Sequence, residues 1–193
     1  MAINMHKLLA DALLEMTKTK KLEAIRVQDL LDETGISRQA FYNRFRDKND
    51  LIQWTYEHNI LSGFLDNGPD ASFYENMICF YETLDRYRYF MRQAVQIRGQ
   101  NNLRDFMYEY AIQYDMKWHQ HYFGDAPLTD DMKFATRYHA VAAIDCAIQW
   151  VSSPNPDPPE TMARRLTNIR QISMSGTIFG EDHNIYAIPL AEA

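Results

Sequence analysis

The sequence predicts an all-α protein of about nine helices, and three observations support that prediction. Apolar residues recur at spacings of three and four through most of the 193 residues, which is the period of an amphipathic helix. The alternating pattern of a β-strand does not occur in the sequence over any credible length. Prolines and glycines gather between the periodic segments, where they mark turns and loops.

Four helices are expected before residue 66. The first covers about residues 3–19, where leucines, alanines and a methionine share one helix face. A short helix at 27–34 is stopped by Gly35, and the third begins after Ser37, which is a good N-cap residue. Asp47 is expected to cap a fourth helix that continues to about residue 65. The three-residue gap between the second and third helices is typical of a helix-turn-helix.

The downstream half is expected to hold five further helices. Residues 67–70, Asn-Gly-Pro-Asp, break the chain, and Ser72 with Glu75 has the form of a capping box that opens the next helix. Residues 152–159 contain four prolines and are therefore expected to form a loop. The five helices are expected at about 72–85, 87–97, 100–123, 130–151 and 159–174.

These elements divide the chain into four expected parts. A helix-turn-helix domain is expected at 1–47, a linking helix at 48–66, a helical body for ligand binding and dimerisation at 67–175, and a C-terminal tail at 176–193.

Composition bounds the class of protein. Hydrophobic residues make up 46% of the chain, which is ample for a buried core, and no apolar run approaches the roughly 20 residues that span a bilayer. The N-terminus lacks the pattern of a secretion signal, so the chain is expected to be cytoplasmic, with no membrane partner. Cys79 and Cys146 have no metal-ligand spacing and are expected to be buried, reduced thiols.

The charge distribution points to one local basic surface. The net charge of −6 argues against a protein that coats nucleic acid by bulk attraction. Residues 1–58 carry nine basic and nine acidic side chains, whereas the rest carries eleven and seventeen. Within 35–48 the only acidic side chain is Asp47, beside four basic ones. A local positive face on an acidic body suits a protein that touches DNA at one place.

The third predicted helix has two distinct faces. Phe41 and Phe45 lie four residues apart and are expected to be buried on one side. The opposite side carries groups that can bond base edges and phosphates, namely Arg38, Gln39, Tyr42, Asn43 and Arg46. A solvated helix in a small bundle is the alternative, but turn spacing, polar face and local charge together favour DNA binding.

The same segment resembles the signature of the tetracycline-repressor family of bacterial transcription regulators. The resemblance lies in Gly35-Ile36-Ser37-Arg38, in Phe41-Tyr42, and in the spacing of Phe45, Lys48 and Leu51, and it covers about residues 6–56. It implies a homodimer in which each chain has a three-helix DNA-binding head, a linking helix and a helical body with an effector pocket.

The resemblance also implies roles for individual residues. Those expected to contact DNA are Arg38, Gln39, Ala40, Tyr42, Asn43, Arg44 and Lys48. Among them, Arg38, Gln39, Ala40 and Tyr42 are expected to face the major groove. Lys48 is expected on a phosphate, and so is Arg44, which stands where the family usually has histidine or tyrosine. Val27 replaces a usual threonine and removes a helix cap.

The body is dense in aromatic residues between Phe73 and Phe123. Such a set can line a pocket for an apolar small molecule, although each aromatic taken alone is more often plain core. Asp145 and Gln149 share one helix face and are interpreted either as polar anchors in the pocket or as residues at a subunit interface. The candidate ligand-binding residues are Met77, Phe80, Phe106, Tyr110, Tyr114, Asp145 and Gln149.

A catalytic function has little support in the sequence. A small metal-dependent hydrolase around His119, His121 and Asp125 is the rival from another class, but the two histidines point to different sides of a helix. The sequence contains no nucleophile elbow, glycine-rich phosphate loop or metal motif. We therefore expect no enzyme activity, no metal and no cofactor.

The sequence hypothesis is a dimeric, sequence-specific DNA-binding regulator, a repressor released by a small-molecule effector. Small residues in 130–151, together with the apolar face of the last helix, are the candidate dimer interface. Residues 90–102 also resemble a subgroup of the same family that includes activators of dihydroxyacetone kinase operons. This second resemblance leaves open an activator controlled by a protein co-regulator.

Overall fold

The computed structural model describes residues 4–65, 71–124 and 126–174, and all regular secondary structure in these ranges is helical. The all-α fold class predicted from the sequence is therefore confirmed. The α-helices are α1 (Met5–Met16), α2 (Val27–Thr34), α3 (Arg38–Tyr42), α4 (Lys48–Thr55), α5 (Leu61–Leu65), α6 (Phe73–Arg86), α7 (Arg88–Ala94), α8 (Leu103–Phe123), α9 (Asp130–Ser152) and α10 (Pro159–Met174). The predicted break at 67–70, Asp125 and the predicted tail at 176–193 lie outside the described residues.

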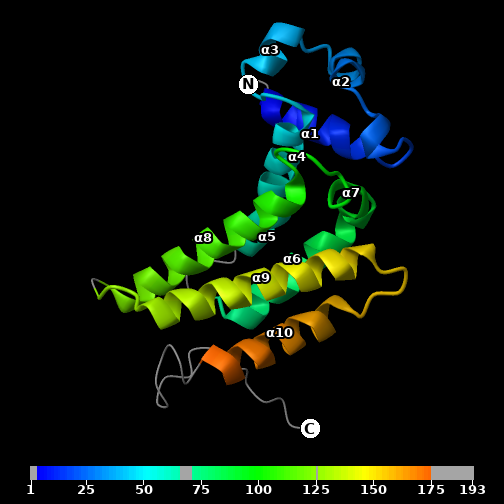
Figure 1. Cartoon of the computed structure of the whole chain (residues 1–193). Coiled ribbons are helices and arrows are strands. Elements are labelled where there is room, and N and C mark those ends of the chain that lie inside the picture. Colours follow the sequence, from blue (N-terminus) through cyan, green and yellow to red (C-terminus); the bar gives the residue numbers. More distant parts are fainter. Residues whose placement is uncertain (1–3, 66–70, 125, 175–193) are drawn as a thin grey trace.

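The molecule is elongated, with a small head and a larger body (Figure 1). The head consists of α1, α2 and α3, with a 3₁₀ turn, η1 (Leu22–Ala24), between α1 and α2. A linking helix descends from the head and consists of α4, a π-helical turn, η2 (Tyr56–Ile60), and α5. In the body α8 packs along α9, and α10 packs along α6.

Helix starts follow the capping residues expected from the sequence. The Ser37 hydroxyl oxygen accepts a hydrogen bond from the Ala40 backbone N–H at 3.2 Å and opens α3. The Asp47 carboxylate accepts from the Asp50 N–H at 2.8 Å and opens α4. Ser72 and Glu75 form the expected reciprocal capping box at the start of α6. These caps satisfy backbone donors that a helix leaves without intrahelical partners.

Four helices are shorter than the sequence pattern suggested, among them α8, which begins at Leu103 instead of about residue 100. α1 ends at Met16, after which the Thr17 hydroxyl donates to the Leu14 carbonyl oxygen at 2.7 Å. α3 ends at Tyr42, although the turn that follows still keeps Phe45 in the core. α7 covers only Arg88–Ala94 instead of 87–97. Apolar periodicity continues into such turns, so it marks helix ends less sharply than helix centres.

One hydrophobic core joins head, linking helix and body. Buried side chains of this core come from α1 to α4, η2, and α6 to α9, with Leu13, Leu51, Ile60 and Phe90 completely or almost completely buried. A continuous core of this kind couples the position of the head to the packing of the body. The two cysteines differ from expectation, since both are partly exposed.

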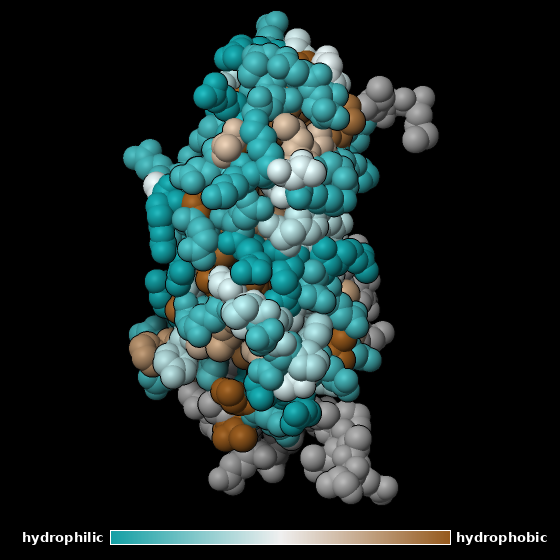
Figure 2. Space-filling view, turned by 90° about the vertical axis from the view of Figure 1, so that its right-hand side faces the viewer, coloured by the Kyte–Doolittle hydropathy of each residue, from teal (hydrophilic) through white to brown (hydrophobic). Residues whose placement is uncertain are grey.

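The surface of the head is largely hydrophilic in the view of Figure 2, whereas apolar atoms are exposed lower down, over the body. In the described part of the chain no helix is long and apolar enough to cross a membrane.

Candidate nucleic-acid interface and body cavity

The turn between α2 and α3 has the geometry of a helix-turn-helix. Gly35 ends α2 in the left-handed region at φ 69°, and its N–H donates to the Leu31 carbonyl oxygen at 2.9 Å. A side chain is strained at this φ, so glycine suits the position. Ser37 then opens α3 two residues later, which sets α3 at a steep angle to α2 (Figure 1).

The buried side of α3 fixes the helix to the rest of the head. Phe41 is completely buried, and Phe45 is 2% exposed. Their rings lie 5.7 Å apart between centroids, and the Phe45 ring also contacts His6 and Trp54. These contacts join α3 and the turn that follows it to α1 and α4, so the inner side of α3 is fixed to the rest of the head.

The outer side of α3 presents polar groups to solvent, as expected. Tyr42 is 48% exposed, which is unusual for a large aromatic residue. Ala40 and Arg44 are partly buried at the edges of this surface. The exposed residues on and just after the helix are Arg38, Gln39, Tyr42, Asn43 and Arg46.

Two arginines on this surface keep an uncompensated charge. The Arg38 guanidinium donates to the neutral Gln28 side-chain oxygen at 2.9 Å, and that of Arg44 donates to the Ala40 carbonyl at 2.8 Å. Arg46 differs, because it forms an ion pair with Asp50 at 3.4 Å. Arg38 and Arg44 therefore supply most of the positive potential that α3 offers to an anion.

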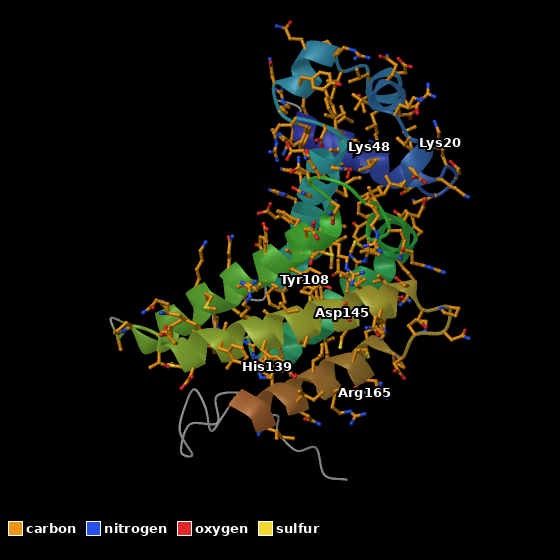
Figure 3. All side chains as sticks on the ribbon, viewed as in Figure 1. Lys20, Lys48, Tyr108, His139, Asp145 and Arg165 are labelled. Atoms are coloured by element: carbon orange, nitrogen blue, oxygen red, sulfur yellow. The ribbon has the colours of Figure 1, made fainter. Side chains whose placement is uncertain are left out.

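Lys48 is the first residue of α4, and its side chain bonds to the head. Its ammonium donates to the carbonyl oxygens of Leu22, Glu23 and Ile25, at 2.8, 3.3 and 2.8 Å. Figure 3 shows Lys48 at the junction of α4 and the head, and its partial burial lowers the pKa of the ammonium. Lys48 therefore ties α4 to the turn before α2.

The body also contacts the head directly, through hydrogen bonds from α7. The Gln93 side-chain oxygen accepts from the Leu22 N–H at 2.8 Å, and its amide nitrogen donates to the Thr17 carbonyl at 3.3 Å. Asn49 and Gln53 of α4 donate to backbone carbonyls of the loop before α8, at 3.1 and 2.8 Å. A change in the packing of α7 or α8 would therefore alter these contacts and shift the head relative to the body.

An apolar cavity of about 70 Å³ lies inside the body. Among the candidate ligand residues, Met77, Phe80, Tyr110 and Tyr114 line it. Phe106 does not line the cavity. Its ring instead packs against those of Tyr110 and Tyr56, at centroid distances of 5.8 and 6.3 Å. The lining that sequence reasoning missed includes Tyr56, Leu61, Phe64, Phe73, Met107, Asp115, Ala143, Leu166 and Arg170.

Asp145 and Gln149 lie away from this cavity, on the outer side of α8 and α9. The Asp145 carboxylate accepts from Arg104 at 3.0 Å, from the Tyr108 hydroxyl at 2.9 Å and from Gln149 at 2.5 Å. Tyr108 and Asp145 lie next to each other on the adjacent helices in Figure 3. This network holds α8 to α9, and it favours the surface interpretation over that of pocket anchors.

Buried polar side chains join α8, α9 and α10 next to the cavity. Arg170 forms an ion pair with Asp115 at 2.9 Å, and its guanidinium lies 4.5 Å from the centre of the Phe73 ring. His119 is completely buried and shares a hydrogen bond of 2.9 Å with the Thr136 hydroxyl. Burial, reinforced by the Arg170 charge, lowers the pKa of His119 to about 4. Sequence reasoning missed this cluster. The signal that could have indicated it is Arg170, a charged residue at helical spacing from the apolar Ala163 and Leu166.

The two histidines of the rival hydrolase hypothesis lie in different surroundings. His119 is engaged with Thr136 inside the body, whereas His121 is exposed. Among the described residues there is no group of three or more histidines, cysteines or carboxylates that could hold a metal ion.

A helix-turn-helix head on a helical body defines a class of transcription regulators, and the comparisons with known proteins agree. A TetR-type family model described as "Transcriptional regulator C-terminal region" matches residues 72–171. The chain therefore belongs to the tetracycline-repressor family of transcription regulators, and it is not an enzyme.

Two relatives share this architecture. The HTH-type dhaKLM operon transcriptional activator DhaS of Lactococcus lactis subsp. lactis (strain IL1403) is 22% identical over 169 residues, which are 84% of this chain and 87% of the relative. A solved structure of a dihydroxyacetone kinase operon activator DhaS superposes with a TM-score of 0.64 at 22% identity, covering 87% of this chain and 94% of that one. At this identity the structural likeness establishes the fold alone.

Proposed function

We propose that this transcription regulator binds a specific DNA sequence as a homodimer, with α3 of each subunit in a major groove. The observation that carries the proposal is the two-sided recognition helix, in which Phe41 and Phe45 are buried and the opposite side is polar and exposed. Its N-terminal end bears Arg38 with an uncompensated charge. A braced helix with such an outer face fits the docking of helix-turn-helix proteins.

The outer face divides into base contacts and phosphate contacts. Arg38 and Gln39 have the donors and acceptors that read guanine and adenine edges, and Ala40 and Tyr42 can contact thymine methyl groups. Asn43 and Arg44 lie at the end of the helix, where side chains meet the backbone of DNA. A phosphate contact by Lys48 remains part of the proposal, although it requires the ammonium to leave at least one of its three carbonyl partners.

The proposed dimer interface is the outer side of α9 and α10. Of the small residues expected there, Ala140 and Ala147 are buried inside the subunit and Ala143 lines the cavity, whereas Ala142 is exposed and stays part of the proposed interface. Apolar side chains that remain exposed on the two helices support the assignment, namely Phe134, Tyr138, Val141, Ile169 and Ile172. A two-fold dimer would present two α3 helices to half-sites about 34 Å apart, one turn of DNA.

The proposed control of DNA binding runs from the body cavity to the head. An effector in the cavity would contact Tyr56 and Leu61 of the linking helix as well as α6 and α8. Because the linking helix and Gln93 both hold the head, an effector that prefers one packing of the body also favours one head position.

The direction of control has two candidates. The sequence hypothesis is repression that a small molecule relieves. The body cavity supports the binding of a small molecule. Activation, with a protein co-regulator, is supported by the name of the relative, which is a transcriptional activator. A promoter carrying the selected sequence decides between them, because transcription rises with the protein for an activator and falls for a repressor.

Selection of DNA from a random oligonucleotide pool by the full chain tests the proposal. We expect an inverted repeat with half-sites about one turn apart, bound by two subunits in sedimentation analysis. Enrichment of no sequence, or binding by a single subunit, would overturn it.

A further inference from the structure

One ion pair is built into the wall of the body cavity. Asp115 of α8 and Arg170 of α10 both line the cavity, and their side chains are only 13% and 6% exposed. The rest of the lining is aliphatic, aromatic or phenolic. Burying an ion pair costs desolvation free energy, so such pairs are uncommon in apolar surroundings. Here the pair supplies the charged groups in the wall of a mainly apolar cavity, and such groups can orient a ligand.

A second, smaller cavity of about 40 Å³ lies on the other side of the same side chains. Both cavities are lined by Phe64, Phe73, Tyr114, Asp115 and Arg170. A dry cavity of about 150 Å³ is known to hold benzene, so neither cavity alone takes a ring. The two cavities together amount to about 110 Å³. A ring therefore enters only when the shared side chains rotate so that they both join and widen the two cavities.

The polar part of this space carries no net charge. The Asp115 and Arg170 charges cancel, and His119 next to them is neutral at pH 7 because its pKa is lowered to about 4. Burial also raises the pKa of the Tyr114 hydroxyl, which therefore stays protonated. An entering anion or cation would add an unbalanced charge to a dry environment, which is strongly unfavourable.

A ligand hydroxyl is the polar group that this wall recognises best. A carboxylate oxygen accepts more than one hydrogen bond, so Asp115 can accept from a hydroxyl while it keeps its bond with Arg170. An apolar ring would meanwhile pack on Phe64, Phe73 and Phe80.

We propose that the cavity binds an uncharged, mainly apolar molecule of about one ring in size, whose hydroxyl donates to the Asp115 carboxylate. The inference deepens the proposed effector role, and it depends on that role only for its consequence for DNA binding.

Four small probes of similar size test this ligand class by calorimetric titration of the full chain. Phenol carries the hydroxyl, toluene has the same shape without it, and benzoate and benzylammonium carry opposite charges. We expect phenol to bind about threefold or more tightly than toluene, because one net hydrogen bond is gained. We expect it to bind about tenfold or more tightly than either ion. An equal affinity for toluene or for an ion, or no saturable binding of any probe, would overturn the proposal.

Two matched variants locate the site. Ala111 lines the cavity, whereas Ile112, the next residue on α8, lines a groove on the outer side of the helix. Ala111→Met should fill the cavity and abolish phenol binding, and Ile112→Met should leave it unchanged. Equal phenol affinity in both variants would overturn the location.

A charge variant tests the role of the ion pair. Asp115→Asn keeps the shape but leaves the Arg170 charge uncompensated, so the affinity for benzoate relative to phenol should rise about tenfold. An unchanged ratio in the folded variant would overturn the role of Asp115. Should this variant fail to fold, the probe series and the Ala111→Met pair still decide the proposal.

Failure of this inference is distinguishable from failure of the proposed function, because the titrations contain no DNA. A chain that selects a DNA sequence but prefers benzoate refutes the inference alone, and one that prefers phenol but selects no DNA refutes the function alone.

Discussion

Head and body use arginine in opposite ways. Arg38 in the head is exposed and donates to a neutral amide, so its charge remains available to an anionic partner. Arg170 in the body is 6% exposed and its charge is cancelled by Asp115. A surface that meets a polyanion gains from uncompensated charge, whereas a cavity for a small neutral molecule needs its charges balanced.

The two regions also differ in how their functional surfaces are assembled. The proposed DNA surface comes from a few consecutive residues of one short helix, braced from behind by Phe41 and Phe45. The cavity is lined by the linking helix and by α6, α8, α9 and α10, so its shape depends on the packing of the whole body. A change in body packing can therefore alter the shape of the cavity and the position of the head together, while α3 itself keeps its structure.

The largest effect is expected from separating the two faces of α3. Phe41→Ala removes a completely buried ring and should lower the free energy of unfolding by about 3–5 kcal/mol. Tyr42→Ala, at the neighbouring exposed position, should cost less than about 1 kcal/mol. Denaturant unfolding of the two variants measures the difference, and equal losses would contradict the two-faced assignment.

The buried cluster of the body predicts a pH dependence of stability. The pKa of His119 is about 4 in the folded chain, below the value of about 6.5 expected in the unfolded chain, so the unfolded state takes up the proton first. His119 should therefore make stability fall by about 1 kcal/mol per pH unit as pH decreases from 6.5 to 4. Above pH 6.5 it should have no effect.

The matched variant for this effect is His119→Gln, which does not titrate. His139, whose pKa is also lowered by burial, and the neighbouring Asp115 and Arg170 are present in both chains, so their contributions largely cancel in the difference. Parallel unfolding curves against pH for the two chains would contradict the assignment.

Replacing Lys48 tests its two proposed roles, which are to hold α4 to the head and to contact a DNA phosphate. Lys48→Met removes three hydrogen bonds from a charged donor to backbone carbonyls and should destabilise the head by about 1.5–3 kcal/mol. Because the proposed phosphate contact is lost with the ammonium, we expect the slope of log affinity against log salt to fall by about one unit. Arg44→Ala should reduce that slope by the same amount. An unchanged slope for Lys48→Met beside a reduced slope for Arg44→Ala would show that Lys48 holds the head without contacting a phosphate.

The smallest effect is expected at the junction between α7 and the head. Gln93→Leu removes both of its hydrogen bonds to the head, at Leu22 and Thr17, along with a third to Tyr89 within α7. The variant should make local opening of the head easier by about 1 kcal/mol. Gln96→Leu, an exposed position just after α7, is the control. Hydrogen exchange of head amides measures the effect, and equal protection in both variants would remove Gln93 from the coupling.

The sequence predicted the head better than the body for a physical reason. Gly35, Ser37 and Asp47 act on neighbouring backbone groups, so their roles can be read from local spacing. The pairing of Asp115 with Arg170 spans 55 positions and depends on how α8 and α10 pack, which local spacing does not determine.

Two other residues illustrate the same limit. The i, i+4 spacing of Asp145 and Gln149 correctly placed them on one face of α9, but it did not say that this face meets Arg104 and Tyr108 on the outer side. Lys48 is likewise close in sequence to the other residues proposed to contact DNA. Its carbonyl partners, however, are 23 to 26 positions away, so local spacing did not indicate them.

The most direct test of the central claim is the base preference of the double variant Gln39→Ala, Tyr42→Ala. Both side chains are exposed, so the variant should fold normally while its discrimination between the selected sequence and single-base changes falls by about 1–3 kcal/mol per lost contact. Competition binding against single-base variants of the selected sequence measures this discrimination. An unchanged preference in a folded variant would show that α3 does not read the bases.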